Sequence, residues 1–302
     1  MPRLRRGIDR RPVPGRLDPV KTLVRVSILP VSVAIMDTGN ALALARGLLA
    51  CRIVDLSSDI TDCPAGPFET RVDVIEGGEG AEIFCDKVAP ALVPEAAGEM
   101  RPEDFPDRAF LRHEQVSASV HAGSHVDAPG HFGLSRGDEH DLISGAPLDA
   151  FVGAGIMLDV SGVSGWRVER SHVRAAVESC GVSEFDEAIV LIHTEREKAI
   201  SADVVGDFLD RGVRVIGTDA EGFDGPFEPM IRRFLQTRDP GVLWPAHFLG
   251  RRRPYYQIER LRNLAALPAH GFVVIAMPVL IAGATAAWTR AVAFVPEQSE
   301  AE

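Results

Sequence analysis

The sequence predicts a single α/β domain in which a mixed β-sheet is flanked by helices. Two observations predict it. Short β-branched runs typical of buried strands recur along the chain, and amphipathic segments with helix-start and helix-stop residues lie between them. Because strands and helices do not alternate strictly, we expect the sheet to contain both parallel and antiparallel neighbours.

Two kinds of strand are expected. Residues 68–75 and 111–120 alternate apolar and polar side chains with a period of two, which is typical of a half-exposed strand. The other expected strands are short and largely apolar, as buried strands are. They cover residues 52–57, 156–160, 188–193, 213–218 and 272–277.

Four helices are expected between or after these strands. Residues 171–180 precede Gly181, and residues 201–211 begin with Ser201 and end before Gly212. Serine is a preferred helix N-cap, and glycine readily adopts the left-handed conformation that ends a helix. Apolar side chains at helical spacing also predict helices over residues 227–237 and 257–267, the second ended by a proline.

Residues 51–298 are expected to form one domain, because no repeat or low-complexity linker divides them. Residues 1–50 are predicted to be an N-terminal extension that is partly disordered. The first 16 of them are basic, rich in proline and glycine, and poor in apolar side chains. Residues 299–302 are predicted to be an acidic tail.

Composition excludes several classes of function. The formal net charge of −11, without a basic stripe, argues against binding to nucleic acid or to an anionic membrane surface. No segment reaches the roughly 18 apolar residues that a membrane-spanning helix needs. The four cysteines form no C-x-x-C pair and are typical of a reduced, cytoplasmic protein. A small molecule is therefore the expected partner.

Four residues within eleven positions point to a metal site: His121, His125, Asp127 and His131. Imidazole and carboxylate groups are common ligands of zinc and manganese. On an extended backbone His125 and Asp127 project to the same side, and Gly123 permits a bend that would bring His121 to them. A single histidine beside glycine and proline usually fills a turn, but four such residues at this spacing favour a metal.

The expected site leaves room for catalysis. Two imidazoles and one carboxylate leave a coordination position open for water, as in catalytic rather than structural zinc sites. A bound metal lowers the pKa of that water and supplies hydroxide as a nucleophile. A second metal would need a shared carboxylate, for which Asp127 has two oxygens. His131 could remain a general acid or base, because the ordinary pKa of histidine is near 6.5.

The segment His-x-Gly-Ser-His-x-Asp-x-Pro-x-His-Phe that begins at His121 resembles the signature of the cyclase-like metal-dependent hydrolases. That family includes bacterial kynurenine formamidase and isatin hydrolase. Residues 53–57 resemble the opening strand of the family, and Gly217-Thr218-Asp219 its buried strand end. The resemblance implies the family's swivelling β/β/α fold and an assembly of two or four identical chains.

The resemblance also implies the roles of the site residues. His121, His125 and Asp127 would hold a first zinc or manganese ion. Asp127 would bridge to a second ion completed by His247 and Glu259, and His131 would transfer protons. Without the resemblance, His247 would be expected to be a packing residue and Glu259 an exposed helix residue.

The predicted function is metal-dependent hydrolysis of a small amide, a formamide such as N-formylkynurenine, a cyclic amide or a lactone. His131 would act as general acid and base. One alternative is a metal-dependent cyclase or dehydratase of a polyketide-like metabolite, and another is a non-catalytic metal-binding protein. The family's Gly-x-x-Gly-Ser-Pro-x-Arg segment is replaced here by residues 283–290, so the substrate stays open.

Two further polar residues are expected to have structural roles. His193 ends an apolar strand and is predicted to be a hydrogen-bonded core histidine. Asp219 follows another strand and is predicted to be a buried hydrogen-bonding residue rather than a metal ligand.

Overall fold

The computed structural model describes residues 38–60, 70–133, 141–196 and 198–297. Most of the predicted N-terminal extension and all of the predicted acidic tail therefore lie outside the described residues. The chain divides into two units, residues 1–46 and 47–302. The described part of the first unit is the beginning of helix α1 (Thr38–Leu49). All the described strands belong to the second unit.

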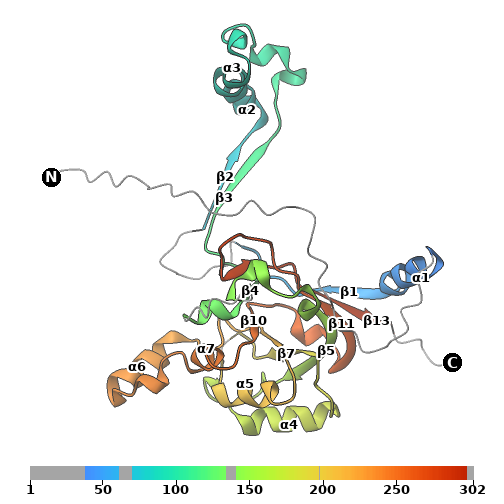
Figure 1. The fold of residues 1–302 in the computed structure, drawn as a ribbon, viewed down its shortest axis with the longest axis vertical. Coiled ribbons are helices and arrows are strands. Elements are labelled where there is room, and N and C mark those ends of the chain that lie inside the picture. The colour runs from blue at the N-terminus through green and yellow to red at the C-terminus, as the bar shows by residue number, and fades with distance from the viewer. Residues whose placement is uncertain (1–37, 61–69, 134–140, 197, 298–302) are drawn as a thin grey trace. The chain divides into compact units, whose positions relative to one another are not determined.

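A nine-stranded mixed sheet is the centre of the second unit, with the order β1-β13-β11-β5-β7-β9-β10-β4-β12 (Figure 1). The central strands β5, β7, β9 and β10 are parallel, and all the other neighbours are antiparallel. The predicted α/β class and mixed sheet are confirmed. The strands are β1 (Cys51–Asp55), β4 (His125–Asp127), β5 (Val152–Asp159), β7 (Ile189–His193), β9 (Val215–Thr218), β10 (Tyr256–Glu259), β11 (His270–Ile275), β12 (Ala286–Trp288) and β13 (Val292–Pro296).

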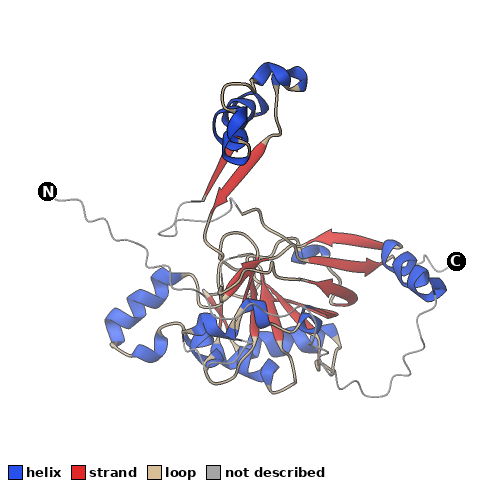
Figure 2. Ribbon diagram, turned by 45° about the horizontal axis from the view of Figure 1, so that its top comes forward, coloured by secondary structure: helices blue, strands red, loops and turns tan. Residues whose placement is uncertain are grey.

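Helices cover one face of the central strands (Figure 2). They are α4 (Arg170–Cys180), α5 (Ala202–Leu209) and α7 (Pro245–Gly250). Their apolar side chains, such as Val173, Phe208 and Ala246, share one buried cluster with Val190 of β7 and Ile216 of β9. This burial is what holds the helices on the sheet, because apolar surface removed from water stabilises at roughly 25 cal/mol per Å².

The other face of the sheet is covered by the curl of the sheet itself. Val54 of β1 and Val295 of β13 lie in the same apolar cluster as Val126 of β4 and Ile258 of β10. β1 and β10 are far apart in the strand order. Even so, Ser57, which follows β1, forms an antiparallel β-bridge with Leu261, which follows β10. The two faces of the sheet therefore have separate cores, and residues that alternate along a strand enter different ones.

Most of the expected elements are confirmed. The predicted short apolar strands correspond to β1, β5, β7, β9 and β11. The helices predicted over residues 171–180, 201–211 and 227–237 correspond to α4, α5 and α6 (Phe227–Thr237). Ser201 caps α5 by accepting a hydrogen bond from Val204 N. Gly181 ends α4 with a left-handed φ of 71°.

The helix expected over residues 257–267 is wrong. This segment supplies strand β10, which lies between β9 and β4, followed by a single 3-10 turn (Leu264–Ala266). Tyr256 and Ile258 enter the core of the curled face, whereas Gln257 and Glu259 point to the opposite face. Hydrogen bonding to a neighbouring strand on each side outweighs the local preference for helix.

The two half-exposed strands form a separate hairpin, in which β2 (Arg71–Ile75) pairs with β3 (His113–Ser117). Between them lie α2 (Gly77–Ile83), a π-helical turn (Phe84–Val88) and α3 (Ala89–Leu92). The aromatic rings of Phe84, Phe105 and Phe110 contact one another and form the small core of this segment. A further short pair joins β6 (Arg167–Val168) to β8 (Ala199–Ile200). Among the described residues, no helix has the length and apolar character needed to cross a membrane.

Candidate metal centre

Strand β4 places the first two predicted ligands. It is only three residues long but pairs with β10 on one side and β12 on the other, so its backbone is fixed on both sides. Val126 enters the core of the curled face, and His125 and Asp127 therefore project from the opposite face. Both side chains are buried, with 1% and 0% of their surface exposed. The predicted shared side of His125 and Asp127 is confirmed.

A tight turn at Gly123 brings His121 to the same carboxylate. Gly123 has a left-handed φ of 62°, and a Cβ atom there would lie 2.7 Å from the carbonyl oxygen of Asp59. Only glycine fits this position without displacing the neighbouring backbone. Beyond the turn, His121 Nδ1 lies 3.1 Å from Asp127 Oδ1. The predicted bend is confirmed.

His131 approaches the other oxygen of Asp127 from the 3-10 turn that follows β4 (Pro129–Phe132). Its Nε2 atom is 3.7 Å from Asp127 Oδ2, and 30% of its side chain is exposed. The rings of His131 and His121 are 4.3 Å apart. Three imidazoles thus surround one buried carboxylate.

His247 and Glu259 complete the group. Glu259 is opposite His125 in the antiparallel pairing of β10 with β4, and its Oε2 atom is 3.4 Å from His125 Nε2. His247 lies on α7, with Nε2 3.9 Å from Glu259 Oε1. All six residues predicted for the site are therefore together. Glu259 is buried in a strand, and the expectation of an exposed helix residue is wrong.

Hydrogen bonds from residues around the site orient the histidines. His125 Nδ1 lies 3.0 Å from the carbonyl oxygen of Gly123, and His247 Nδ1 lies 2.7 Å from Asp224 Oδ2. Each bond turns Nε2 of its ring toward Glu259, as is usual for histidines that bind metals. Phe223 N donates to Glu259 Oε1 at 3.0 Å. Asp224 was not predicted, because a lone aspartate in a Gly-Phe-Asp-Gly-Pro turn carries no metal-binding pattern.

The buried charges shift one another's protonation. Burial alone would raise the pKa of Asp127, but the surrounding imidazoles of His125, His131 and His121 outweigh it and hold that pKa below its ordinary range. Burial also opposes the ionised form of Glu259, yet its close contact with the His125 imidazole keeps the pKa of Glu259 low. Both carboxylates are therefore ionised near neutral pH.

The pKa values of His131 and His247 shift in opposite directions. Burial lowers the pKa of His131, and its attraction to Asp127 is too weak to compensate. Burial also disfavours the cationic form of His247, but the hydrogen bond to Asp224 and the charge of Glu259 raise its pKa to about 9. Near pH 7 His131 is neutral, and His247 carries a proton that a metal ion would have to displace.

Orphaned buried atoms show that these residues suit a divalent ion. His125 Nε2 and both oxygens of Asp127 are buried and have no hydrogen-bond partner among the described residues. Leaving such groups unpaired costs about 1–3 kcal/mol each, more when they are charged. A cation bound between them would satisfy them, and the donor atoms are those that zinc and manganese take.

The ligand atoms form two groups in which all atoms lie within 4.8 Å of one another. The first contains His121, His125 and Asp127, as predicted. The second contains Asp127, His131 and His247, so His131 stands where the family resemblance assigns Glu259. Asp127 belongs to both groups, which suits a carboxylate shared by two ions.

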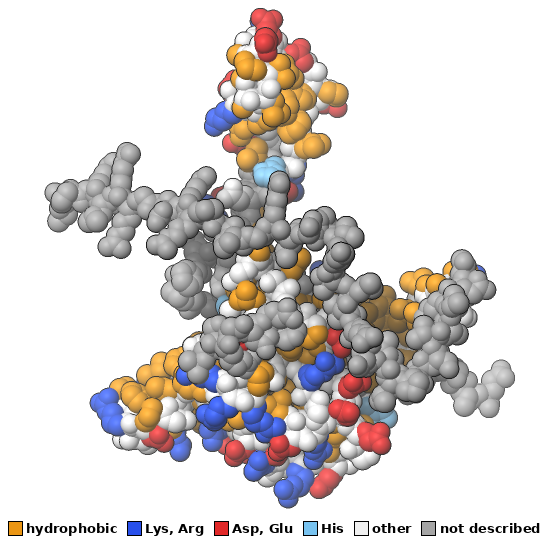
Figure 3. Space-filling view, viewed as in Figure 1, with side chains coloured by type: hydrophobic (Ala, Val, Ile, Leu, Met, Phe, Trp, Pro, Cys, Tyr) orange, Lys and Arg blue, Asp and Glu red, His pale blue; other side chains and the backbone are white. Residues whose placement is uncertain are grey.

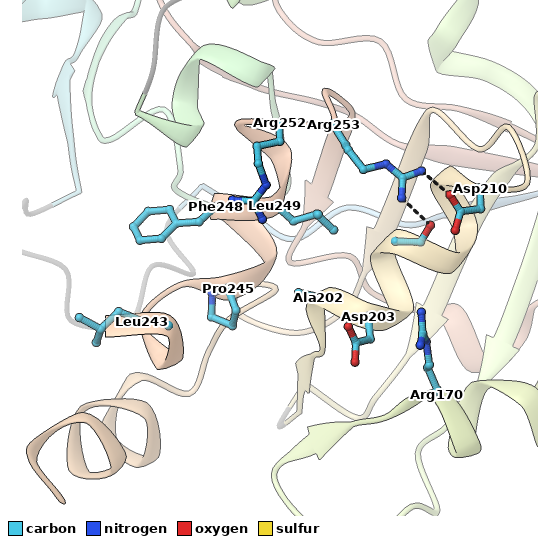
Figure 4. Close-up of a pocket in the computed structure, with 12 residues that line it drawn as sticks. Arg170, Ala202, Asp203, Asp210, Leu243, Pro245, Phe248, Leu249, Arg252 and Arg253 are labelled. Atoms are coloured by element: carbon cyan, nitrogen blue, oxygen red, sulfur yellow. Dashed lines mark hydrogen bonds and ion pairs between the residues drawn. The ribbon is translucent and has the colours of Figure 1, made fainter. Parts of the chain in front are cut away.

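A separate cavity of about 450 Å³ lies between α5 and α7 (Figure 4). Arg170, Arg252 and Arg253 line it together with Asp203 and Leu249. None of the six site residues lines this cavity. Arg253 is held in place at the edge of this cavity by an ion pair with Asp210.

Comparisons with known proteins agree with this geometry. The family model described as "Putative cyclase" matches residues 54–225. A kynurenine formamidase of Salinibacter ruber is 32% identical over 199 residues, which cover 62% of this chain and 81% of that protein. A kynurenine formamidase of Maricaulis maris is 28% identical over 189 residues, covering 59% and 78%.

Solved structures share the fold. Isatin hydrolase A from Labrenzia aggregata, bound to benzyl benzoate, aligns with a TM-score of 0.62 at 23% identity, covering 86% of this chain and all of the other. Isatin hydrolase A from Ralstonia solanacearum aligns with the same TM-score at 19% identity, covering 87% and 98%. The resemblance predicted from the residues around His121 is confirmed, and so is the fold that it implies.

Proposed function

We propose, on the premise that this chain belongs to the family described as "Putative cyclase", that it is a metal-dependent hydrolase of a small amide, formamide, cyclic amide or lactone. One observation carries the proposal most strongly. Asp127 is an ionised, fully buried carboxylate without a hydrogen-bond partner among the described residues, and it lies among three imidazoles. Without a cation this arrangement would be costly, because a buried charge needs a compensating partner.

Two zinc or manganese ions are proposed for the centre. His121, His125 and Asp127 would hold the first, and Asp127, His247 and Glu259 the second. Ions bound there would supply an acidic water and positive charge beside the substrate carbonyl oxygen. Gly123, Asp224 and Phe223 would keep the ligands in place through the hydrogen bonds that they make to His125, His247 and Glu259.

His131 is proposed to transfer protons. Its pKa is lowered by burial, so His131 is neutral near pH 7, and part of its ring is exposed where a substrate could reach it. A neutral imidazole can accept a proton from attacking water and deliver it to the departing nitrogen or oxygen. The contact between His131 and Asp127 would orient the ring for that transfer.

The substrate is proposed to contain an aromatic or other flat apolar group. Residues 283–290, which depart from the family pattern, include β12, the direct neighbour of β4. Trp288 is paired with His125 across these strands, so the two side chains lie on the same face. Trp288 Nε1 donates to the carbonyl oxygen of Ser119 at 2.9 Å, which fixes the indole beside the histidines.

The alternative of ring closure or dehydration is favoured only by the description of the family. Hydrolysis and cyclisation differ in their use of water. Reaction in ¹⁸O-labelled water would place one label in the product of hydrolysis and none in the product of ring closure.

A homodimer or homotetramer is also proposed. The hairpin of β2 and β3, together with the segment between the two strands, exposes apolar side chains (Figure 3). They include Val72, Val74, Leu92, Leu111 and Val116. A two-stranded hairpin is marginally stable by itself, and contact with another chain would cover these side chains. A cytoplasmic location remains a prediction, consistent with the free thiols of Cys51, Cys85 and Cys180.

The function is tested with a panel of isatin, N-formylkynurenine, formanilide and an aryl lactone, using protein loaded with zinc or with manganese. We expect metal-dependent turnover of at least one compound, abolished by a chelator and restored by the ion. Absence of turnover across the panel, with metal bound, would favour the non-catalytic alternative.

A further inference from the structure

A second cluster of titratable side chains lies on the opposite face of the sheet from the metal centre. Ile189, Leu191 and, by alternation, His193 of β7 point to the core of the curled face. His125 and Asp127 project from the other face. The cluster lies where β7 and β9 end, and ligands of parallel sheets usually bind at such carboxyl ends.

His193 and Asp219 form a fixed pair in this cluster. His193 Nδ1 is 2.7 Å from Asp219 Oδ2. The other oxygen of Asp219 accepts hydrogen bonds from Thr194 N at 2.7 Å and from Thr194 Oγ1 at 2.8 Å. The predicted role of Asp219 as a buried hydrogen-bonding residue is confirmed. Because Asp219 fixes the ring of His193 through Nδ1, Nε2 is the nitrogen that remains for another partner.

A cavity of about 380 Å³ opens beside this pair. Its lining contains buried residues, half-buried polar side chains and exposed residues. Asp219, Leu261 and Leu264 are buried, and His193, Arg196 and Arg262 are half-buried. Arg262 is anchored, because its Nε donates to Ser58 Oγ at 2.9 Å.

Three non-glycine residues that line the cavity have left-handed backbones. Their φ angles are 59° for Glu195, 73° for Arg196 and 58° for Asn263. Asp219 helps to hold the first of them, because Glu195 N donates to Asp219 Oδ2 at 3.2 Å. Such backbones concentrate at ligand sites when the surrounding structure maintains them.

We propose that this cavity binds a small molecule with a carboxylate or phosphate group. Two guanidinium groups line it, and the planar fork of arginine matches these oxyanions. His193 would contact the ligand through Nε2, the nitrogen that Asp219 leaves available. Leu261 and Leu264 would contact a short apolar part of the ligand. No residue of this cavity belongs to the six of the metal centre, so the proposal does not depend on the proposed hydrolysis.

Calorimetric titration of the full chain tests the proposal, with sodium phosphate and sodium benzoate as probes at constant ionic strength. We expect saturable binding of at least one probe, weakened at least about tenfold by His193→Gln and by Arg262→Gln. Arg232→Gln is the matched control, because Arg232 is an exposed arginine paired with Glu228 on α6. It should bind like the unmodified protein. Thermal unfolding of each variant identifies any that fail to fold.

The Asp127→Asn variant distinguishes probe binding in this cavity from anion binding at the metal centre. It should abolish metal binding but leave probe binding unchanged. Binding of benzoate alone would identify a carboxylate site, and binding of phosphate alone a phosphate site. The proposal is wrong if neither probe saturates. It is also wrong if Asp127→Asn removes the binding, or if folded His193→Gln and Arg262→Gln bind as tightly as the unmodified chain.

Discussion

His125 and Glu259 lie opposite each other where β4 pairs with β10, and their Nε2 and Oε2 atoms are 3.4 Å apart. This pairing joins the histidine-rich segment to a residue far along the chain. It also fixes both side chains on rigid, doubly paired strands rather than on loops. The proposed metal centre thus depends on the register of one short antiparallel pair, and a slip of one residue would turn these side chains to the opposite face.

Glu259→Gln should remove the second ion and keep the first. The amide has nearly the shape of the carboxylate, but it carries no charge to balance a divalent ion. Elemental analysis should show metal content falling from about two to about one equivalent per chain. Glu228→Gln, on the exposed face of α6, is the control and should keep both ions. Retention of two ions by Glu259→Gln would remove Glu259 from the ligand set.

His131→Ala should lower turnover by roughly 10²-fold or more, because general acid–base catalysis contributes that much. Metal content should stay unchanged if His131 transfers protons. Loss of one ion together with activity would instead make His131 a ligand, as its proximity to His247 and Asp127 permits. Parallel measurements of turnover and metal content distinguish the two roles.

Metal binding should depend on pH through His247. In the metal-free protein its pKa is about 9, so at pH 7 it is protonated, and it must lose that proton to bind an ion. Affinity at the second position should therefore rise about tenfold per pH unit between pH 7 and 9 and level off above. At pH 7, binding should release about one proton from His247, which a pH-indicator dye in weak buffer would detect.

His247→Gln provides the comparison for that experiment. It should release about one proton fewer at pH 7, and the rise of affinity with pH should be flatter. An unchanged proton release in this variant would mean that His247 does not bind the ion.

Gly123→Ala should destabilise the protein more than Gly271→Ala. Both glycines have left-handed φ angles, 62° and 85°. A Cβ atom at Gly123 would lie 2.7 Å from Asp59 O, whereas at Gly271 no atom of the described part of the chain would lie within 4 Å of it. Gly271→Ala should therefore cost only the conformational term, roughly 1–2 kcal/mol. Urea unfolding of the metal-free variants would measure the difference, and equal costs would contradict the close approach at Gly123.

Much of the site could be predicted from the sequence because its first part is local. His121, His125, Asp127 and His131 lie within one turn-strand-turn segment, so periodicity and one flexible glycine were enough to bring them together. The buried strands β5, β7 and β9 were equally visible as apolar runs between turn residues.

The rest depends on tertiary structure. The segment that contains Glu259 has apolar residues that fit either a helix or a strand, and only its two neighbouring strands decide between them. Asp224 acts through a ring that comes from α7, so nothing near it in the sequence indicates its role. The pairing of His193 with Asp219 similarly requires β7 and β9 to be neighbours.

Metal content per chain is the most direct test of the central claim. The measurement is elemental analysis of protein purified without a histidine tag, beside an Asp127→Ala variant. We expect about two equivalents of zinc or manganese in the unmodified protein and almost none in the variant, because Asp127 is shared by both groups of ligands. Protein that binds no ion even after zinc and manganese are added back would contradict the proposed metal centre.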